Sequence, residues 1–183
     1  MTTPARYTRT AVALHWLLAV AIAATFSLGV YMHELPDTPD RSRLYDWHKG
    51  AGACILALSM LRLLWRLTHR PPADLAMPHW QARAARAVHW LMYALFLAVP
   101  LAGWAHSSAA GQPVLVFGVL TLPDFVPVDK ALADAAKGLH QLLGSALAIL
   151  VIGHVAAALK HHFVDGDGLL ARMAWRDAGG RAG

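Results

Sequence analysis

The sequence is poor in charge and nearly free of cysteine. Charged residues make up 15% of its 183 residues and hydrophobic residues 57%, with a mean hydropathy of +0.42. A soluble domain needs more polar surface than this, so the composition favours a protein whose solvent is the bilayer. The single cysteine, Cys54, excludes a disulfide framework, and no Cys-x-x-Cys-His motif is present for covalent c-type haem attachment. No basic stripe is interleaved with aromatic residues, which excludes a nucleic-acid partner.

Long apolar runs are what the sequence has instead. A helix needs roughly 20 mainly apolar residues to cross about 30 Å of hydrocarbon. Four stretches meet that requirement, at approximately residues 11–32, 47–67, 87–106 and 139–159. We therefore expect an all-α membrane protein, a four-transmembrane-helix bundle, with residues 1–183 forming a single domain.

The distribution of lysine and arginine between the connections predicts the orientation. One side carries eleven of these residues and the other side carries five. Because cytoplasmic loops are richer in lysine and arginine, we place both termini in the cytoplasm. The eleven are Arg6, Arg9, Arg62, Arg66, Arg70, Arg83, Arg86, Lys160, Arg172, Arg176 and Arg181; the five are Arg41, Arg43, Lys49, Lys130 and Lys137.

Four of the eleven histidines fall at two matched depths in the predicted spans. One depth holds His15 and His154, near the cytoplasmic ends of the first and fourth spans. The other holds His48 and His140, at the outer starts of the second and fourth spans. The 14 residues from His140 to His154 rise about 21 Å and fall about 40° short of four turns, so both side chains face the same way. We therefore predict two haems b, each with its iron between two imidazoles of opposing helices.

A weak internal repeat leaves the pairing at the inner depth open. Residues 13–17 (Ala-Leu-His-Trp-Leu) are similar to residues 87–91 (Ala-Val-His-Trp-Leu), so that His89 rather than His154 mirrors His15. A pseudo-twofold axis along the membrane normal would relate the two helical hairpins. A single intramembrane histidine can also act as a hydrogen-bond partner between helices or as a proton relay. The haem prediction therefore depends on the four histidines together.

Two arginines stand one turn apart near the cytoplasmic end of the second span. Arg62 and Arg66 each carry the forked, permanently charged guanidinium that pairs well with a haem propionate. The alternative is that both side chains extend to the headgroup region and only anchor the helix.

Several short motifs, in their order along the chain, resemble the bacterial cytochrome b561 family from Tyr7 to about Met173. The motifs are His15-Trp16, His48, Arg62-Leu-Leu-Trp-Arg66-Leu, Phe117-Gly118 followed by Leu122-Pro123, and His140 to His154 followed by Ala156-Ala-Ala-Leu-Lys-His161-His162. The resemblance implies a bacterial inner-membrane protein with two haems b. It also implies that His15 pairs with His154 and His48 with His140.

The family includes a superoxide oxidase, which passes electrons from periplasmic superoxide to ubiquinone, and the resemblance implies the same activity here. The five outer cations would attract superoxide, although seven acids on that side leave a net charge of 5 − 7 = −2. Arg86, His89 and His161 lie at the cytoplasmic ends of the third and fourth spans. There they would hold the quinone and relay protons, or would only anchor the helices.

Two other functions are compatible with the sequence. A relay cytochrome would move electrons between the quinone pool and a periplasmic redox protein or partner subunit, without superoxide chemistry. A transporter or channel would use its histidines as proton relays and bind no haem. A haem count separates the last of these from the cytochromes, and rapid mixing with superoxide separates the enzyme from the relay. Membrane lipid is a partner in every case.

Overall fold

The computed structural model describes residues 6–73, 75 and 77–175, and helices make up most of this part of the chain. The elements are α1 (Arg9–Glu34), α2 (Pro39–Thr68), α3 (His79–Ala109) and α4 (Lys130–Lys160), followed by a π-helix η1 (His161–Asp165) and a 3-10 helix η2 (Leu170–Met173). Four helices are long and apolar enough to cross a membrane. The prediction of four apolar helices is therefore confirmed. Arg176 and Arg181, which entered the charge count, lie outside the described residues.

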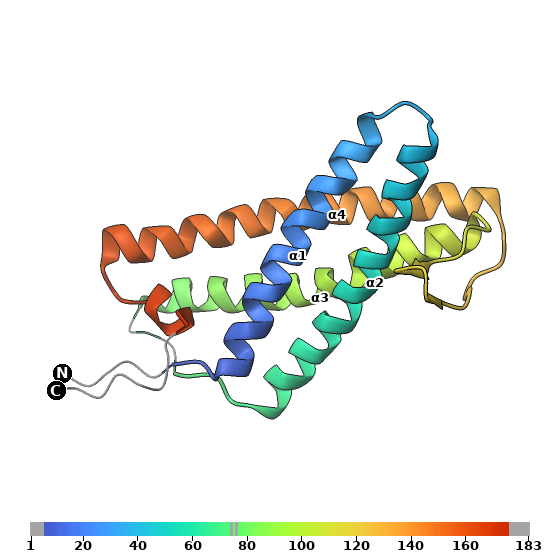
Figure 1. Ribbon diagram of the computed structural model, residues 1–183. Helices are drawn as coiled ribbons and strands as arrows, with labels where there is room; N and C mark the ends of the chain where they lie inside the picture. Colours follow the sequence, from blue (N-terminus) through green and yellow to red (C-terminus); the bar gives the residue numbers. More distant parts are fainter. Residues whose placement is uncertain (1–5, 74, 76, 176–183) are drawn as a thin grey trace.

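The four long helices form two antiparallel hairpins, α1 with α2 and α3 with α4, which cross each other at a steep angle (Figure 1). The hairpins meet along α2 and α3. A small apolar core of Met92, Leu95, Phe96 and Leu147 lies between α3 and α4. Large apolar side chains such as Ile149 remain exposed on the outer helix faces, where lipid would solvate them.

The helices extend beyond the predicted spans because capping residues, rather than hydropathy, set their ends. The Thr38 side chain caps α2, and Pro39 occupies its first turn. Asp129 caps α4 in the same way. His48 and His140 therefore lie between two and three turns inside their helices. The expectation that they sit at the helix starts was wrong.

The connection between α3 and α4 contains a short β-hairpin that the sequence analysis did not predict. β1 (Leu115–Val116) pairs with β2 (Leu120–Thr121), and Phe117 and Gly118 turn between them with φ of 49° and 73°. Such turns favour Asn-Gly, so the phenylalanine conceals the usual signal. The hairpin packs on α2 at Gly50, where a Cβ would lie 3.3 Å from the Leu115 carbonyl oxygen. This connection therefore packs against the helical bundle.

Candidate functional site

His48 of α2 and His140 of α4 face each other across the two hairpins. Their ring centres are 5.9 Å apart. Two metal–imidazole bonds of about 2 Å, with about 1.1 Å from each nitrogen to its ring centre, require a separation of about 6.2 Å. The pair therefore has nearly the spacing that two axial ligands of one metal atom need.

Main-chain carbonyl groups of neighbouring helices orient both of these imidazoles. His48 Nδ1 lies 3.2 Å from the Thr25 carbonyl oxygen, and His140 Nδ1 lies 2.9 Å from that of Val99. Because a carbonyl oxygen can only accept, each Nδ1 carries the proton and donates it. Nε2 is then the unprotonated nitrogen that can bind a metal, and the Nδ1 contact sets the tautomer and the ring plane.

A glycine one turn after each carbonyl lets the imidazole come close to the helix backbone. A Cβ at Gly29 would lie 3.0 Å from His48 Cε1. A Cβ at Gly103 would lie 3.0 Å from His140 Nδ1 and 3.1 Å from its Cε1. Any larger residue at either position would push the ring away from the carbonyl oxygen that orients it.

These contacts repeat at a constant offset along the chain. The step from Thr25 to Val99 is 99 − 25 = 74 residues, and the step between the two glycines is 103 − 29 = 74. The step from His15 to His89, on which the predicted repeat depended, is also 89 − 15 = 74. The structure thus supports the internal repeat. Applied along the sequence, the same offset pairs Gly29 with Gly103, two glycines that the sequence analysis did not consider.

Each of the two histidines is followed one turn later by a second glycine, Gly52 after His48 and Gly144 after His140. A Cβ at either glycine would meet no atom within 4 Å. A helix face without a side chain beside a ligand suits the approach of a flat macrocycle. Ring spacing, tautomer and helix surface therefore all fit a haem at this level of the bundle.

A second group of imidazoles lies 154 − 140 = 14 residues further along α4 and contains three rings. The centre of the His154 ring is 6.2 Å from that of His15 on α1 and 5.5 Å from that of His89 on α3. The first separation matches the requirement of about 6.2 Å for a shared metal, and the second is short by about 0.7 Å. The geometry therefore favours His15 over His89 as the partner of His154.

Arg62 of α2 lies beside this second group. Its Nη2 is 2.9 Å from His15 Nδ1, and its guanidinium carbon lies 5.7 Å from the centre of the Tyr93 ring. A guanidinium has no acceptor, so Nδ1 of His15 accepts here and the neutral ring carries its proton on Nε2. Metal binding through Nε2 requires Arg62 to turn to another acceptor, and a propionate is a suitable one. Arg66 makes no hydrogen bond or ion pair with any residue that the structure describes.

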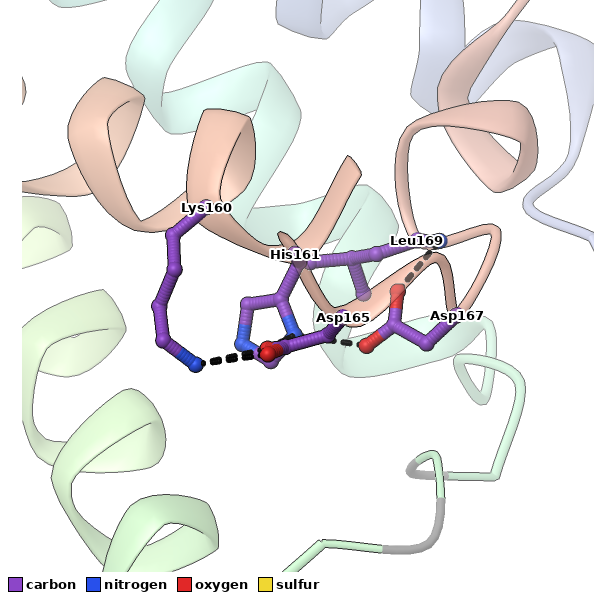
Figure 2. Close-up of polar contacts among 5 residues, drawn as sticks. All are labelled: Lys160, His161, Asp165, Asp167 and Leu169. Atoms are coloured by element: carbon purple, nitrogen blue, oxygen red, sulfur yellow. Dashed lines mark hydrogen bonds and ion pairs between the residues drawn. The ribbon is translucent and has the colours of Figure 1, made fainter. Parts of the chain in front are cut away.

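His161 begins η1, and its ring lies against two carboxylates (Figure 2). Its Nδ1 is 2.6 Å from Asp167 Oδ2 and 3.2 Å from Asp165 Oδ2. Lys160 Nζ is 2.7 Å from the same Asp165 oxygen. Partial burial raises the pKa of Asp167, but hydrogen bonds from the Leu169 N–H and from His161 outweigh it and hold that pKa below its ordinary value. The side chains of His161, Asp165 and Asp167 come close enough to share a metal ion. However, the Lys160 ammonium and the His161 imidazole already contact the oxygens of the two carboxylates.

The three residues predicted to hold a quinone lie at one end of the α3–α4 hairpin. Arg86 and His89 are exposed residues, one turn apart on α3. His89 contacts His154, and His161 follows His154 by 161 − 154 = 7 residues, a rise of about 10.5 Å. All three predicted residues are therefore near the inner imidazole group or just beyond it.

Comparisons with known proteins identify the family of this chain. A family model described as prokaryotic cytochrome b561 matches residues 6–176. The chain is 36% identical over 173 residues to cytochrome b561 homolog 2 of Escherichia coli (strain K12), covering 93% of this chain and 92% of that protein. It is 32% identical over 170 residues to the probable superoxide oxidase CybB of Yersinia pestis, and the match covers 92% of this chain and 95% of that protein. Identity to cytochrome b561 homolog 1 of Escherichia coli (strain K12) is 28% over 170 residues, covering 92% and 96%.

The family match extends over all four long helices and both imidazole groups. The family implies haem b as the cofactor, and the four apolar helices make the chain an integral membrane protein. The chain belongs to the prokaryotic cytochrome b561 family, whose members transfer electrons in the membrane.

Proposed function

We propose that this protein binds two haems b and carries electrons across the bacterial inner membrane, from superoxide at the periplasmic face to ubiquinone at the cytoplasmic face. The observation that carries the proposal is the pair of imidazole groups stacked about 21 Å apart along α4, at His140 and His154. Haem bound at both levels supplies one-electron transfer between the two faces. Residues 1–183 then form one domain with both termini in the cytoplasm.

The histidines hold the cofactors, and their neighbours set the geometry. His48 and His140 would hold one haem and His15 and His154 the other, each through Nε2. Two strong nitrogen ligands on each iron favour electron transfer over oxygen binding at the metal. Near the inner pair, the Arg62 guanidinium would pair with a haem propionate in place of His15 Nδ1, and Arg66 would supply a second positive charge one turn away.

Attraction of superoxide depends on the cations at the periplasmic end. Four of them, Arg41, Arg43, Lys49 and Lys130, lie 2.9 to 3.8 Å from an aspartate oxygen, which offsets their charge. Lys137 has no acidic partner within ion-pair distance in the described part of the chain. It precedes His140 by one turn, so we assign the local attraction of the superoxide anion to Lys137. The relative from Yersinia pestis is named a probable superoxide oxidase, which supports this choice of substrate.

Ubiquinone reduction is assigned to the cytoplasmic end, where Arg86, His89 and His161 supply hydrogen-bond donors for the quinone oxygens. Reduction of the quinone consumes protons as well as electrons, and an imidazole can give a proton near neutral pH. The seven-residue step from His154 to His161 puts a proton donor on the same side of α4 as the inner haem ligand.

Rapid mixing of the oxidised, haem-loaded protein with superoxide tests the proposal. We expect haem reduction much faster than in a control with superoxide dismutase, and reduction of added ubiquinone only when the cytochrome is present. If the haems are reduced no faster than in that control, superoxide is not the substrate.

A relay cytochrome is the second candidate, and the ion pairs at the periplasmic end favour it. Cations already paired with aspartates attract a small anion weakly, whereas a protein surface with alternating charges can dock a partner. In that case a quinol would reduce both haems quickly, and superoxide would not. The same rapid-mixing experiment with quinol in place of superoxide distinguishes the two functions.

A further inference from the structure

The chain turns back on itself directly after α4, and the turn encloses His161. The Gly166 N–H bonds to the His161 carbonyl oxygen, and the Asp167 N–H lies 3.4 Å from the same oxygen. Gly166 and Gly168 have φ of 63° and 74°, which few other residues adopt. These two glycines bring the Asp167 carboxylate back to the imidazole. Figure 2 shows the carboxylate beside the His161 ring.

We propose that Asp167 is a positioning residue for proton transfer to the quinone. Its carboxylate holds one imidazole proton of His161 on Nδ1, so that Nε2 is the nitrogen that gives a proton to a quinone oxygen. The inference rests on the proposed reduction of quinone at the cytoplasmic end.

The contacts of His161 leave only one of its nitrogens available. Nδ1 is 2.6 Å from Asp167 Oδ2, a short charge-assisted hydrogen bond that fixes the tautomer. Nε2 has no hydrogen-bond partner among residues 6–73, 75 and 77–175. The side chain is 17% exposed, so its position is restricted but still open to a ligand.

The charges around the ring also suit a proton donor. Lys160 Nζ contacts Asp165 at 2.7 and 2.9 Å and balances that carboxylate. Asp167 is then the carboxylate left for the imidazole, and a ring protonated on both nitrogens makes the group of four side chains neutral. The Asp165 side chain is 31% exposed, which keeps the group in contact with cytoplasmic water.

The proton and electron count is complete. One quinone takes up two electrons and two protons, one proton on each carbonyl oxygen, to give the quinol. The two electrons come one at a time from two superoxide anions, which leave as dioxygen. His161 gives its Nε2 proton to one quinone oxygen, remains neutral with its Nδ1 proton hydrogen-bonded to Asp167, and regains the Nε2 proton from cytoplasmic water. The proton on the second quinone oxygen comes from cytoplasmic water.

The test uses Asp167→Asn, which keeps the size of the side chain and removes its charge. Haem reduction by superoxide should be unchanged, while reoxidation of the haems by a short-chain ubiquinone should slow by about 10- to 100-fold. Asp134→Asn, the same change in an exposed ion pair at the other end of α4, is the matched control for the quinone step and should leave reoxidation of the haems by ubiquinone at the parental rate. Nitrogen-15 NMR should show His161 protonated at Nδ1 in the parent and a mixture of tautomers in Asp167→Asn.

A double-mutant cycle separates positioning from a structural role. If Asp167 acts through His161, the double variant with His161→Gln should be as slow as His161→Gln alone. The inference would be overturned if the double variant were slower than His161→Gln by the factor that Asp167→Asn alone produces. It would also be overturned if Asp167→Asn reduced quinone at the wild-type rate. If Asp167→Asn does not accumulate with haem, Asp167→Glu restores a carboxylate, and it must then restore both the tautomer and the rate. If the parent itself does not reduce the short-chain ubiquinone, the proposed function fails first, and the inference fails with it.

Discussion

A single methyl group at Gly103 should weaken one haem site and leave the other intact. In Gly103→Ala the new Cβ would lie 3.0 Å from His140 Nδ1 and 3.1 Å from its Cε1, whereas ordinary contact begins at 3.4 Å. The imidazole is a rigid ring, so it has to move by about 0.4 Å or more. That movement is directed away from α3, which holds the carbonyl that orients the ring.

The cost follows from the contact that is lost. The hydrogen bond from His140 Nδ1 to the Val99 carbonyl is 2.9 Å long, and the shift stretches it toward the limit of a useful bond. Loss of one such bond costs about 1 kcal/mol. Loss of the group that orients a metal-bound histidine lowers metal affinity by about 10- to 100-fold. We therefore expect haem to leave the His48–His140 site about 10 to 100 times faster.

Haem transfer to excess apomyoglobin, followed by visible absorption, measures this rate. One of the two haems of Gly103→Ala should transfer quickly and the other at the parental rate. Gly138→Ala is the matched control, because this glycine lies two residues before His140, is exposed, and has no atom within 4 Å of an added Cβ. Parental transfer from Gly103→Ala, or equal acceleration in Gly138→Ala, would show that the glycine does not set the position of the ligand.

Four further predictions concern other parts of the molecule. Lys137→Gln should slow haem reduction by superoxide and make the rate less dependent on ionic strength. Lys130→Gln, which removes a cation already paired with Asp134, should have little effect on the rate. Stopped-flow measurements at two salt concentrations check both expectations. Arg62→Gln should shift the midpoint potential of the inner haem alone, because a propionate loses its cation, and a redox titration with both haems resolved checks it. Because the pKa of Asp167 is lowered in the folded protein, its hydrogen bonds stabilise the turn after η1 above about pH 4, and this stabilisation is lost as the pH falls through the lowered pKa. Hydrogen exchange of the Leu169 amide should become faster over that pH range, and Asp167→Asn should abolish the pH dependence of the exchange. Reporter fusions at either terminus should be active only when the reporter works in the cytoplasm.

The sequence predicted the elements whose cause is local and regular. Apolar runs long enough for the bilayer specified the four helices, and the helical rise placed His140 and His154 at two depths on one side. Helix ends were less predictable, because Thr38 and Asp129 cap their helices in polar segments that hydropathy ignores.

Contacts between distant segments were beyond the sequence. The hydrogen bond of Arg62 to His15 joins two helices across 62 − 15 = 47 residues, and nothing in either helix alone indicates it. The bond of Asp167 to His161 depends on a π-turn closed by two glycines, a backbone path that periodicity does not describe. Gly103 differs, because the offset of 74 residues that separates His15 from His89 also separates Gly29 from Gly103.

Counting the haems of the purified protein checks whether the four histidines hold two cofactors. We predict two haems b per chain, both low-spin in the ferric state, with one haem lost in His140→Ala and one in His154→Ala. His89→Ala should retain two, since the spacing of 5.5 Å to His154 is too short for a shared iron. One haem per chain in the parent, or loss of a haem in His89→Ala but not in His154→Ala, would contradict the assignment of the two ligand pairs.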